Sequence, residues 1–209
     1  VEAGADIIVI GSGAAGLTTA LALAPRRVTL LTKTPTLSSG STELAQGGIA
    51  AALDPADSVG DHAADTIKAG AGLSHASRVE MLARDGLARI HDLIASGMQF
   101  DLDSDGCPAL GKEAAHRCRR ILHAGGDATG RRLHETLARR VAATPAISVE
   151  TEVFAWDLVA SEGRVRGVLV HDAARGWRMH KASQVVVATG GIGQLFRATT
   201  NPAESTADG

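Results

Sequence analysis

The stretch Asp6-Ile-Ile-Val-Ile10-Gly11-Ser-Gly13-Ala-Ala-Gly16 decides the fold, because a short apolar segment runs straight into a Gly-x-Gly-x-x-Gly turn and then into a helical pattern. The four residues Ile7 to Ile10 predict a strand buried on both faces, as in a parallel sheet. Gly11 permits the tight bend, Gly13 lets the backbone approach a pyrophosphate, and Gly16 lets helix and strand pack closely. The Ala-, Leu- and Thr-rich residues 14–24 predict a helix whose N-terminus attracts a phosphate. We expect a dinucleotide here; a tight turn without a ligand is the alternative.

Composition narrows the class of protein. The 209 residues suffice for one large α/β domain, and a formal net charge of -2 gives no basic field for nucleic acid or an anionic membrane surface. An aromatic content of 2% leaves few platforms on which bases could stack. No apolar run approaches the length of a bilayer span, and no basic leader precedes the first strand. We therefore expect a cytoplasmic protein with neither a nucleic-acid nor a membrane partner.

Further along the chain, residues 28–32 and 184–188 predict two more parallel strands, the second of which ends in Thr189-Gly190-Gly191. Segments 148–153, 155–160, 164–172 and 177–181 predict an antiparallel layer inserted into that architecture. Helices are predicted over 58–69, 77–96 and 131–143, with Thr129 or Asp127 as the N-cap of the last and a core-facing apolar stripe on the second. The expected fold class is α/β, a Rossmann-like domain with a parallel sheet and an inserted antiparallel β layer.

No metal site is expected. Asp101, Asp103 and Asp105 suggest calcium, but the twelfth position counted from Asp101 is Lys112 instead of the glutamate of an EF-hand loop, which favours a solvated turn. The histidines and the two cysteines lack the spacing of a zinc site, and the cysteines do not suggest a disulfide framework.

The residues after the second predicted strand bear on the kind of dinucleotide. The usual fingerprint has an acidic residue about 20 positions on that binds the ribose, whereas this chain has Leu31-Thr32-Lys33. A lysine there could suggest the 2′-phosphate of NADP. The loop from Ser39 to Gly48, with its hydroxyls and paired glycines, would let backbone N–H groups crowd a flat polar ring system, and so favours a flavin.

Several segments in order resemble the N-terminal part of the succinate dehydrogenase/fumarate reductase flavoprotein family, and within it the L-aspartate oxidases. The resemblance implies an FAD-binding domain over 1–209, with the family's capping and C-terminal helical domains absent from this chain, so that the fragment alone holds flavin weakly and does not turn over. The segments are Ile10-Gly-Ser-Gly-Ala-Ala-Gly16, Leu30-Leu-Thr-Lys33, Gly40-Ser-Thr-Glu-Leu-Ala-Gln-Gly-Gly-Ile-Ala-Ala51, Asp65-Thr-Ile-Lys-Ala-Gly-Ala-Gly72, Arg119-Arg-Ile-Leu-His-Ala-Gly-Gly-Asp-Ala-Thr-Gly130, Ala188-Thr-Gly-Gly191 and Thr199-Thr-Asn-Pro202.

The resemblance also implies how the flavin is held. Members with a covalently bound flavin carry a histidine four residues before the Ala-Gln-Gly-Gly stretch, and this chain has Ser41 there, so FAD is expected to be non-covalent. The FAD contacts implied by the resemblance are Gly11, Ser12, Gly13, Ala14, Ala15, Gly16, Lys33, Ser41, Thr42, Ala45, Gln46, Gly47, Gly48 and Asp208.

The activity implied by the resemblance is oxidation of L-aspartate to iminoaspartate in NAD biosynthesis, with quinolinate synthase as acceptor of the product. Oxygen, which gives hydrogen peroxide, or fumarate would re-oxidise the flavin. Glu113 matches a glutamate that orients the substrate amine, as an ammonium requires an anionic partner, and the catalytic arginine lies outside this chain. A surface carboxylate beside Lys112 is the alternative for Glu113. The sequence departs from the family's usual Gly-Gly at Ala114-Ala115 and from its Ser-His at Arg117-Cys118.

Two other functions share parts of this pattern. A non-covalent fumarate reductase or succinate dehydrogenase-type flavoprotein has nearly all of these motifs, whereas a non-catalytic FAD-binding module needs the glycine turn but not the Glu113 segment. The basic segment His116, Arg119, Arg120 and His123 is compatible with a dicarboxylate-facing surface or with a solvated helix start.

Overall fold

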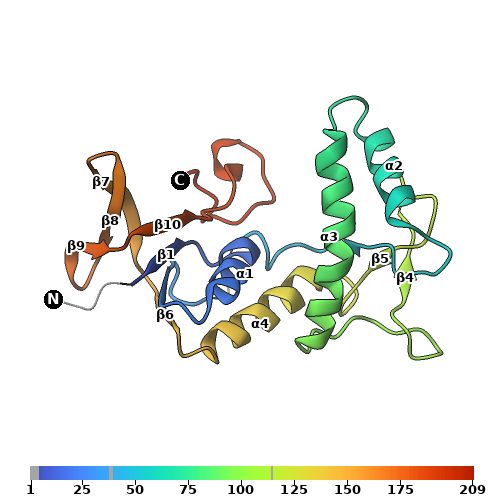
Figure 1. Ribbon diagram of the computed structural model, residues 1–209, viewed down its shortest axis with the longest axis horizontal. Helices are drawn as coiled ribbons and strands as arrows, with labels where there is room; N and C mark the ends of the chain where they lie inside the picture. The colour runs from blue at the N-terminus through green and yellow to red at the C-terminus, as the bar shows by residue number, and fades with distance from the viewer. Residues whose placement is uncertain (1–4, 38–39, 114) are drawn as a thin grey trace. The chain divides into compact units, whose positions relative to one another are not determined.

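The computed structural model describes residues 5–37, 40–113 and 115–209, and the chain divides into two compact units (Figure 1). The first unit contains the described residues up to Leu44 and those from Leu133 onward, and the second contains Ala45 to Arg132. Ala114, where the sequence departs from the family pattern, lies outside the described residues.

A four-stranded parallel sheet with the order β10-β1-β2-β6 forms the centre of the first unit. Its strands are β1 (Ile7–Ile10), β2 (Val28–Leu31), β6 (Ile147–Glu150) and β10 (Gln184–Val187). Ile8 and Val9 are fully buried, as expected for a strand covered on both faces. The fold class predicted from the sequence is confirmed.

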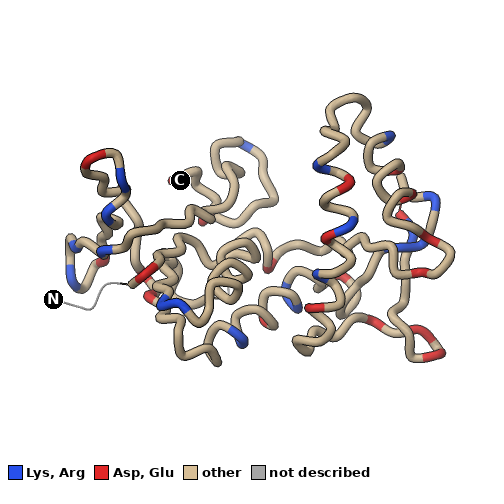
Figure 2. Tube along the Cα trace, viewed as in Figure 1, with Lys and Arg blue, Asp and Glu red and all other residues tan. Residues whose placement is uncertain are grey.

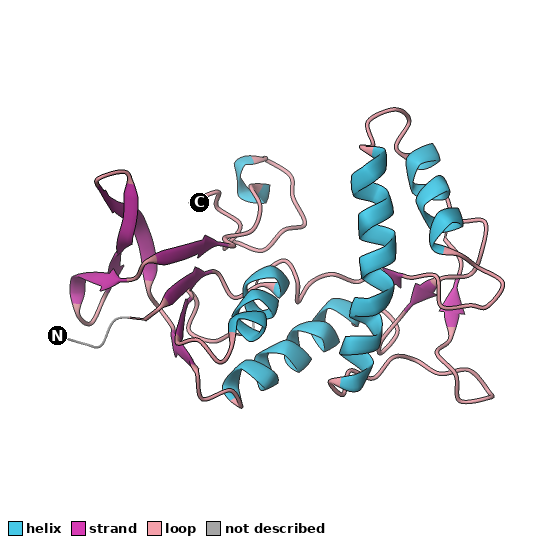
Figure 3. Ribbon diagram, in the orientation of Figure 1, coloured by secondary structure: helices cyan, strands magenta, loops and turns pink. Residues whose placement is uncertain are grey.

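The place of β6 corrects one prediction. Residues 148–153 were expected in the antiparallel layer, but Ile147 pairs with Val28 in a parallel register, so β6 extends the central sheet. The helix α4 (Thr129–Ala142) comes directly before β6, and a helical crossover is the usual way for a chain to return to a parallel sheet. The antiparallel sheet instead contains β7 (Phe154–Ser161), β8 (Arg164–Asp172) and β9 (Gly176–Lys181), which Figure 3 shows as consecutive strands.

Both sheets of the first unit contribute to one apolar core. Ile8 and Leu31 of the parallel sheet pack against Val168 and Val170 of β8. Two residues that flank the antiparallel sheet, Val153 before β7 and Ala182 after β9, belong to the same cluster. All six are buried, and β10 also approaches β8. The antiparallel sheet is thus fixed to the parallel sheet by apolar packing as well as by chain connectivity.

Helix α1 (Ala14–Leu23) packs on β1 and β2 through contacts that only glycine permits. A Cβ on Gly16 would lie 1.8 Å from the carbonyl oxygen of Gly11. Gly11 itself has φ +109°, and a Cβ there would lie 2.2 Å from the carbonyl oxygen of Ala188, at the end of β10. The roles given to Gly11 and Gly16 from the sequence, a bend and a close approach, are therefore confirmed.

The second unit combines two helices with a small sheet. Its helices α2 (Val59–Ala69) and α3 (Ala76–Ala95) pack against each other, and Ser58 caps α2 by accepting a hydrogen bond from the Asp61 N–H. The sheet has the order β3-β5-β4 and consists of the strands β3 (Ile49–Ala50), β5 (Ile121–Leu122) and β4 (Leu110–Gly111). Such short strands have no period that a sequence pattern can reveal.

Two helix predictions need correction. The stripe on α3 was expected to face a core, and Ile90 is buried, but Leu82 is 69% exposed, because α3 buries only a narrow strip around Ala83 and Ile90. Helix α4 begins at Thr129, so this residue is inside the helix. Its hydroxyl accepts a hydrogen bond from the Ala124 N–H, in the segment before the helix.

Charged residues of both signs are interspersed along the chain (Figure 2). No helix in the described part of the chain is long and apolar enough to cross a bilayer. A single 3-10 turn, η1 (Gly193–Leu195), follows β10 in the first unit.

The contact at Gly16 gives a test of the fold. Gly16→Ala should destabilise the first unit by about 1 to 3 kcal/mol, because the added methyl meets rigid backbone. The measurement is urea unfolding followed by the fluorescence of Trp156 and Trp177, both of which belong to the first unit. Gly191→Ala is the control, since no described atom beyond its chain neighbours lies within 4 Å of its Cβ position, and it should shift stability by less than about 0.5 kcal/mol. Equal stability of the two variants would contradict the close-packing role.

Candidate functional site

A pocket opens in the first unit at the carboxyl ends of β1, β2 and β10, where open α/β sheets bind ligands. Its wall includes the turn between β1 and α1, the loop residues 40–42 and part of the segment 204–208. The predicted site residues that line it are Gly11, Ser12, Gly13, Lys33, Ser41, Thr42 and Asp208. The structure thus brings together residues from both ends of the chain.

Three hydrogen bonds hold the glycine turn in place. The Gly11 N–H donates to the Leu31 carbonyl at 2.9 Å, and the Ser12 and Thr32 hydroxyls lie 2.9 Å apart. The buried ring of His134 on α4 donates from Nε2 to the Ser12 carbonyl at 2.9 Å, because a carbonyl oxygen can only accept. Sequence reasoning missed this role of His134, since a single histidine within a helical pattern gives no signal of it.

The N-terminus of α1 faces this pocket, and a distant residue caps it. Gly13 stands at the N-cap position and offers no side chain. The Ala14 N–H instead donates to the hydroxyl of Thr42 at 3.1 Å. Thr42 therefore lies at the helix end where free N–H groups and the helix dipole favour an anion.

Lys33 and Asp208 form an ion pair in the same pocket. The Lys33 Nζ lies 2.5 Å from Asp208 Oδ2 and donates to the Thr206 hydroxyl at 2.6 Å, while that hydroxyl also bonds to Asp208. The hydrogen bond from Lys33, followed by that from Thr206, lowers the pKa of Asp208 below its ordinary value. The charge of Lys33 is thus matched by a carboxylate of this chain, which disfavours the NADP interpretation of this lysine.

Ser41 connects the loop residues 40–42 to the last part of the chain. Its hydroxyl donates to Asn201 Oδ1 at 3.0 Å and lies 3.1 Å from the Ser205 hydroxyl. The two segments that close the pocket are therefore joined by direct polar contacts.

The pocket fits a flat, phosphate-bearing cofactor. Around Gly190 and Gly191 no described atom other than their chain neighbours lies within 4 Å of the position that a Cβ would occupy, and at Gly13 the nearest is the Thr42 hydroxyl at 3.5 Å. Backbone is therefore accessible just after the ends of β1 and β10, in two segments that both line the pocket. The helix N-terminus adds the positive end of a dipole. These are the features that a dinucleotide requires.

Comparison with known proteins agrees with this geometry. The model of the family described as "FAD binding domain" matches residues 6–209. The chain belongs to this FAD-binding family. FAD is therefore its cofactor, as the loop after β2 suggested.

Curated relatives are similar over nearly the whole chain. The L-aspartate oxidase of Streptomyces coelicolor is 45% identical over 212 residues, which cover 98% of this chain and 36% of that protein. The L-aspartate oxidase of Bacillus subtilis is 42% identical over 204 residues, which cover 97% of this chain and 38% of that protein. This member of the FAD-binding family thus spans little more than a third of the length of these relatives.

Solved structures share the fold. The Mycobacterium smegmatis Sdh1 complex in the apo form matches with a TM-score of 0.91 at 29% identity, covering 98% of this chain and 37% of that one. A mutant of E. coli quinol fumarate reductase FrdA matches with a TM-score of 0.91 at 28% identity, covering 98% of this chain and 35% of that one. The FAD-binding fold of these flavoproteins therefore extends through nearly the whole of this chain.

The remaining predicted FAD residues lie elsewhere. Ala14, Ala15 and Gly16 form the first turn of α1, while Ala45 to Gly48 belong to the second unit. There the Ala45 carbonyl accepts from the Gly130 N–H, and a Cβ on Gly48 would lie 2.3 Å from Ile121 Cγ2. Gly48 is thus required for packing against β5, whatever else it contacts.

A second hollow, within the second unit, is lined by Gln46, Asp101 and His123 among others. Glu113 lies nearby on the loop after β4, with its Oε1 3.9 Å from His123 Nε2 and its side chain 58% exposed. Asp101 accepts hydrogen bonds from the N–H groups of Gly125 and Gly126. The Glu113 carboxylate is therefore accessible to a ligand.

Two of the aspartates considered for calcium, Asp101 and Asp103, accept hydrogen bonds from nearby backbone N–H groups. The bonds from Gly126 and Gly125 lower the pKa of Asp101 below its ordinary value. Asp103 Oδ1 accepts from the N–H groups of Asp105 and Cys107, both at 2.9 Å, which is the geometry of a side-chain-stabilised turn. The prediction of a turn in this segment is confirmed.

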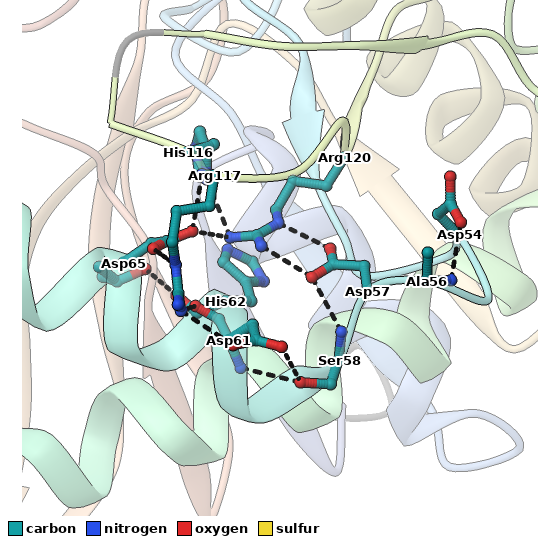
Figure 4. Close-up of polar contacts among 11 residues, drawn as sticks. Asp54, Ala56, Asp57, Ser58, Asp61, His62, Asp65, His116, Arg117 and Arg120 are labelled. Carbon is teal, nitrogen blue, oxygen red and sulfur yellow. Dashed lines mark hydrogen bonds and ion pairs between the residues drawn. The ribbon is translucent and has the colours of Figure 1, made fainter.

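An ion cluster with a buried centre lies in the second unit, and we call Asp57, Asp61, Asp65, Arg117 and Arg120 the Arg120 cluster (Figure 4). The Arg120 side chain is 0% exposed and binds Asp57 with two bonds of 2.8 Å, while its Nη1 donates to Asp65 at 2.9 Å. Neither sequence interpretation of Arg120, as a substrate-facing or a solvated residue, anticipated complete burial. A buried pair left without one partner costs about 3 to 5 kcal/mol, so this arginine is structural.

Electrostatics within the Arg120 cluster favour the charged forms. The hydrogen bond from the Arg117 backbone N–H, helped by the side chains of Arg117 and Arg120 and opposed by burial, lowers the pKa of Asp65 to about 2. Burial would raise the pKa of Asp57, but the hydrogen bonds from Arg120 and Ser58 outweigh it and the net shift is downward. Both carboxylates therefore remain ionised at neutral pH.

The lowered pKa of Asp65 makes the unfolding free energy of the second unit depend on pH in the acidic range. Because the pKa of Asp65 falls from 3.8 to about 2 on folding, its stabilisation is complete above pH 3.8 and disappears as the pH falls towards 2. Asp65→Asn should therefore flatten the decrease in unfolding free energy across this range, measured by urea unfolding at several pH values with circular dichroism. Asp61→Asn, on the same helix, should retain the wild-type slope. An identical slope in wild type and Asp65→Asn would contradict the assignment.

Proposed function

We propose that the protein is an FAD-dependent oxidoreductase that oxidises L-aspartate to iminoaspartate. The observation that carries this proposal is 42–45% identity to L-aspartate oxidases over at least 95% of the chain. A single family model spanning 6–209 supports the view that both units are parts of one FAD-binding domain. When bound, FAD supplies a two-electron acceptor, while the protein orients the substrate.

Glu113 is the residue of this chain that we assign to the substrate. Its carboxylate is exposed, and its Oε1 lies 3.9 Å from His123 Nε2. An ionised carboxylate can accept hydrogen bonds from an α-ammonium group and so fix the direction of the substrate Cα–H bond. We propose this orienting role for Glu113 in place of the simple surface carboxylate.

The cofactor is proposed to be non-covalent, with contacts from the turn Gly11 to Gly16, from Lys33, Ser41, Thr42 and Asp208, and from the loop 45–48. At Ser41, where flavin-linked relatives carry a histidine, the side chain is a hydroxyl already bonded to Asn201. A serine hydroxyl offers no imidazole nitrogen for a bond to the flavin. Ser41 instead supports the wall of the pocket.

The wider role is a further part of the proposal. Oxygen, which yields hydrogen peroxide, or fumarate re-oxidises the flavin, and iminoaspartate passes to quinolinate synthase in cytoplasmic NAD biosynthesis. A non-covalent fumarate reductase is the second candidate, favoured by the match to the quinol fumarate reductase FrdA structure. The lower identity of that match, 28%, makes it the weaker candidate.

The mode of flavin attachment can be tested directly. Acid precipitation of the intact, yellow protein should release all of its flavin into the supernatant, because only polar contacts hold it. Absorbance of the supernatant and in-gel fluorescence of the pellet measure the two fractions. Fluorescence that stays with the denatured polypeptide would show a covalent bond and refute this part of the proposal.

Substitution of Glu113 tests the substrate. In the intact protein, Glu113→Gln should raise the KM for L-aspartate roughly tenfold or more, because a charge-assisted hydrogen bond is lost, while the FAD dissociation constant stays unchanged. The assay compares peroxide production from aspartate with the oxidation of succinate and the reduction of fumarate. Glu80→Gln, an exposed residue on α3, is the matched control and should leave all of these rates unchanged.

Three outcomes decide among the functions. Aspartate oxidation with an altered KM in Glu113→Gln supports the proposal. Turnover of succinate or fumarate but not of aspartate would favour the fumarate reductase. Binding of FAD without any turnover, unaffected by Glu113→Gln, would favour a non-catalytic FAD-binding module.

A further inference from the structure

Glu113 lies on a loop whose two ends are fixed by a strand pair. Residues 112–120, all of them described except Ala114, connect β4 to β5, in which Gly111 pairs with Ile121. The Arg120 N–H donates to the Gly111 carbonyl at 3.0 Å, which closes the loop at its base. Contacts at the two ends of the loop do not fix the direction of the Glu113 side chain. The contacts along the loop must do so.

Asp65 on α2 holds the loop at its middle. Its Oδ2 accepts the backbone N–H of Arg117 at 2.9 Å, and its Oδ1 accepts the Arg117 Nε at 2.6 Å. The same carboxylate accepts from Arg120 Nη1 at 2.9 Å. One side chain that is 3% exposed therefore binds the loop both at its backbone and at its closing residue (Figure 4).

The contacts continue from Arg120 towards Glu113. Arg120 Nη1 also lies 3.2 Å from His116 Nδ1, which must accept, because a guanidinium only donates. The His116 N–H in turn donates to the Glu113 carbonyl at 3.1 Å. A continuous series of hydrogen bonds thus runs from Asp65 through Arg120 and His116 to the backbone of Glu113.

We propose that Asp65 is a positioning residue for the substrate site, because its carboxylate fixes the loop 112–120 and thereby the direction of Glu113. The inference rests on the proposed function, since it concerns how Glu113 meets L-aspartate. Asp65 itself does not touch the substrate. Its effect passes through the backbone N–H of Arg117 and through the pair formed by Arg120 and His116.

Asp61 offers a matched comparison. It lies one turn before Asp65 on α2 and binds Arg117 Nη2 at 2.9 Å, but its side chain is 45% exposed and it bonds to no backbone N–H of the described loop residues. An exposed ion pair contributes little. The same substitution at the two positions therefore separates the fixing of the loop from the loss of one negative charge near Arg117.

The kinetic test uses the intact protein with FAD bound. Asp65→Asn should raise the KM for L-aspartate roughly tenfold, because an amide cannot replace the carboxylate at three donors, with FAD content and FAD affinity unchanged. Asp61→Asn should keep the KM within about twofold of wild type. A fall in FAD content that parallels the loss of activity in Asp65→Asn would mean general destabilisation and would overturn the proposal.

A double-substitution cycle shows whether Asp65 acts through Glu113. If it does, Asp65→Asn added to Glu113→Gln raises the KM little further, because the side chain being positioned is already lost. Multiplication of the two effects would mean that Asp65 acts independently of Glu113, and the positioning role would be wrong.

Hydrogen exchange tests the loop without reference to activity. In Asp65→Asn the amides of residues 115–119, above all that of Arg117, should exchange faster than in wild type, with exchange in α3 unchanged. Unchanged exchange in the loop would overturn the inference even if aspartate is the substrate. Faster exchange in a protein that does not oxidise aspartate would instead show that the proposed function has failed, and with it the link to a substrate, although Asp65 fixes the loop.

Discussion

The structure depends on the close approach of backbone to backbone where β1 turns into α1. The carbonyl oxygen of Gly11 occupies the space of a side chain at position 16, and Gly11 itself lies against the end of β10. Because three elements meet without intervening side chains, the N-terminus of α1 points into the pocket at the carboxyl ends of β1, β2 and β10. The hydrogen bond from His134 to the Ser12 carbonyl, and the one between the hydroxyls of Ser12 and Thr32, then hold the turn in one conformation. The pocket, which is the proposed cofactor site, is thus a consequence of packing that glycine alone allows.

The first unit was largely predictable because its signals are local. A buried strand, a glycine turn and an Ala-rich helix leave a pattern within a few residues, and the structure agrees at β1, α1, β2 and β10. The error at β6 arose because short apolar strands look alike whether they pair in parallel or antiparallel. The helix α4 before β6 explains the parallel pairing, because a helical crossover returns the chain in the same direction. This information lies in the connection and not in the residues of the strand.

The second unit shows where sequence reasoning ends. Nothing in the composition of β3, β4 and β5 separates them from loops, since pairing across more than 70 residues, as between Ile49 and Leu122, leaves no local period. The burial of Arg120 was equally invisible, because its partners Asp57 and Asp65 are distant in sequence and each would be expected at the surface. The lining of the pocket in the first unit, by contrast, includes seven of the residues that the family resemblance implied as FAD contacts.

The order of strands in the parallel sheet bears on how the polypeptide acquires its form during synthesis. Strand β1 is synthesised before β10, yet one of its edges is covered only by that later strand, at residues 184–187. Until the ribosome has delivered that segment, a row of amide and carbonyl groups on β1 stays open to wrong partners. The ion pair of Lys33 with Asp208 completes the enclosure later still. The pocket at the carboxyl ends of these strands is therefore completed only when residues 184–208 have been made, and chaperone protection would matter most before then.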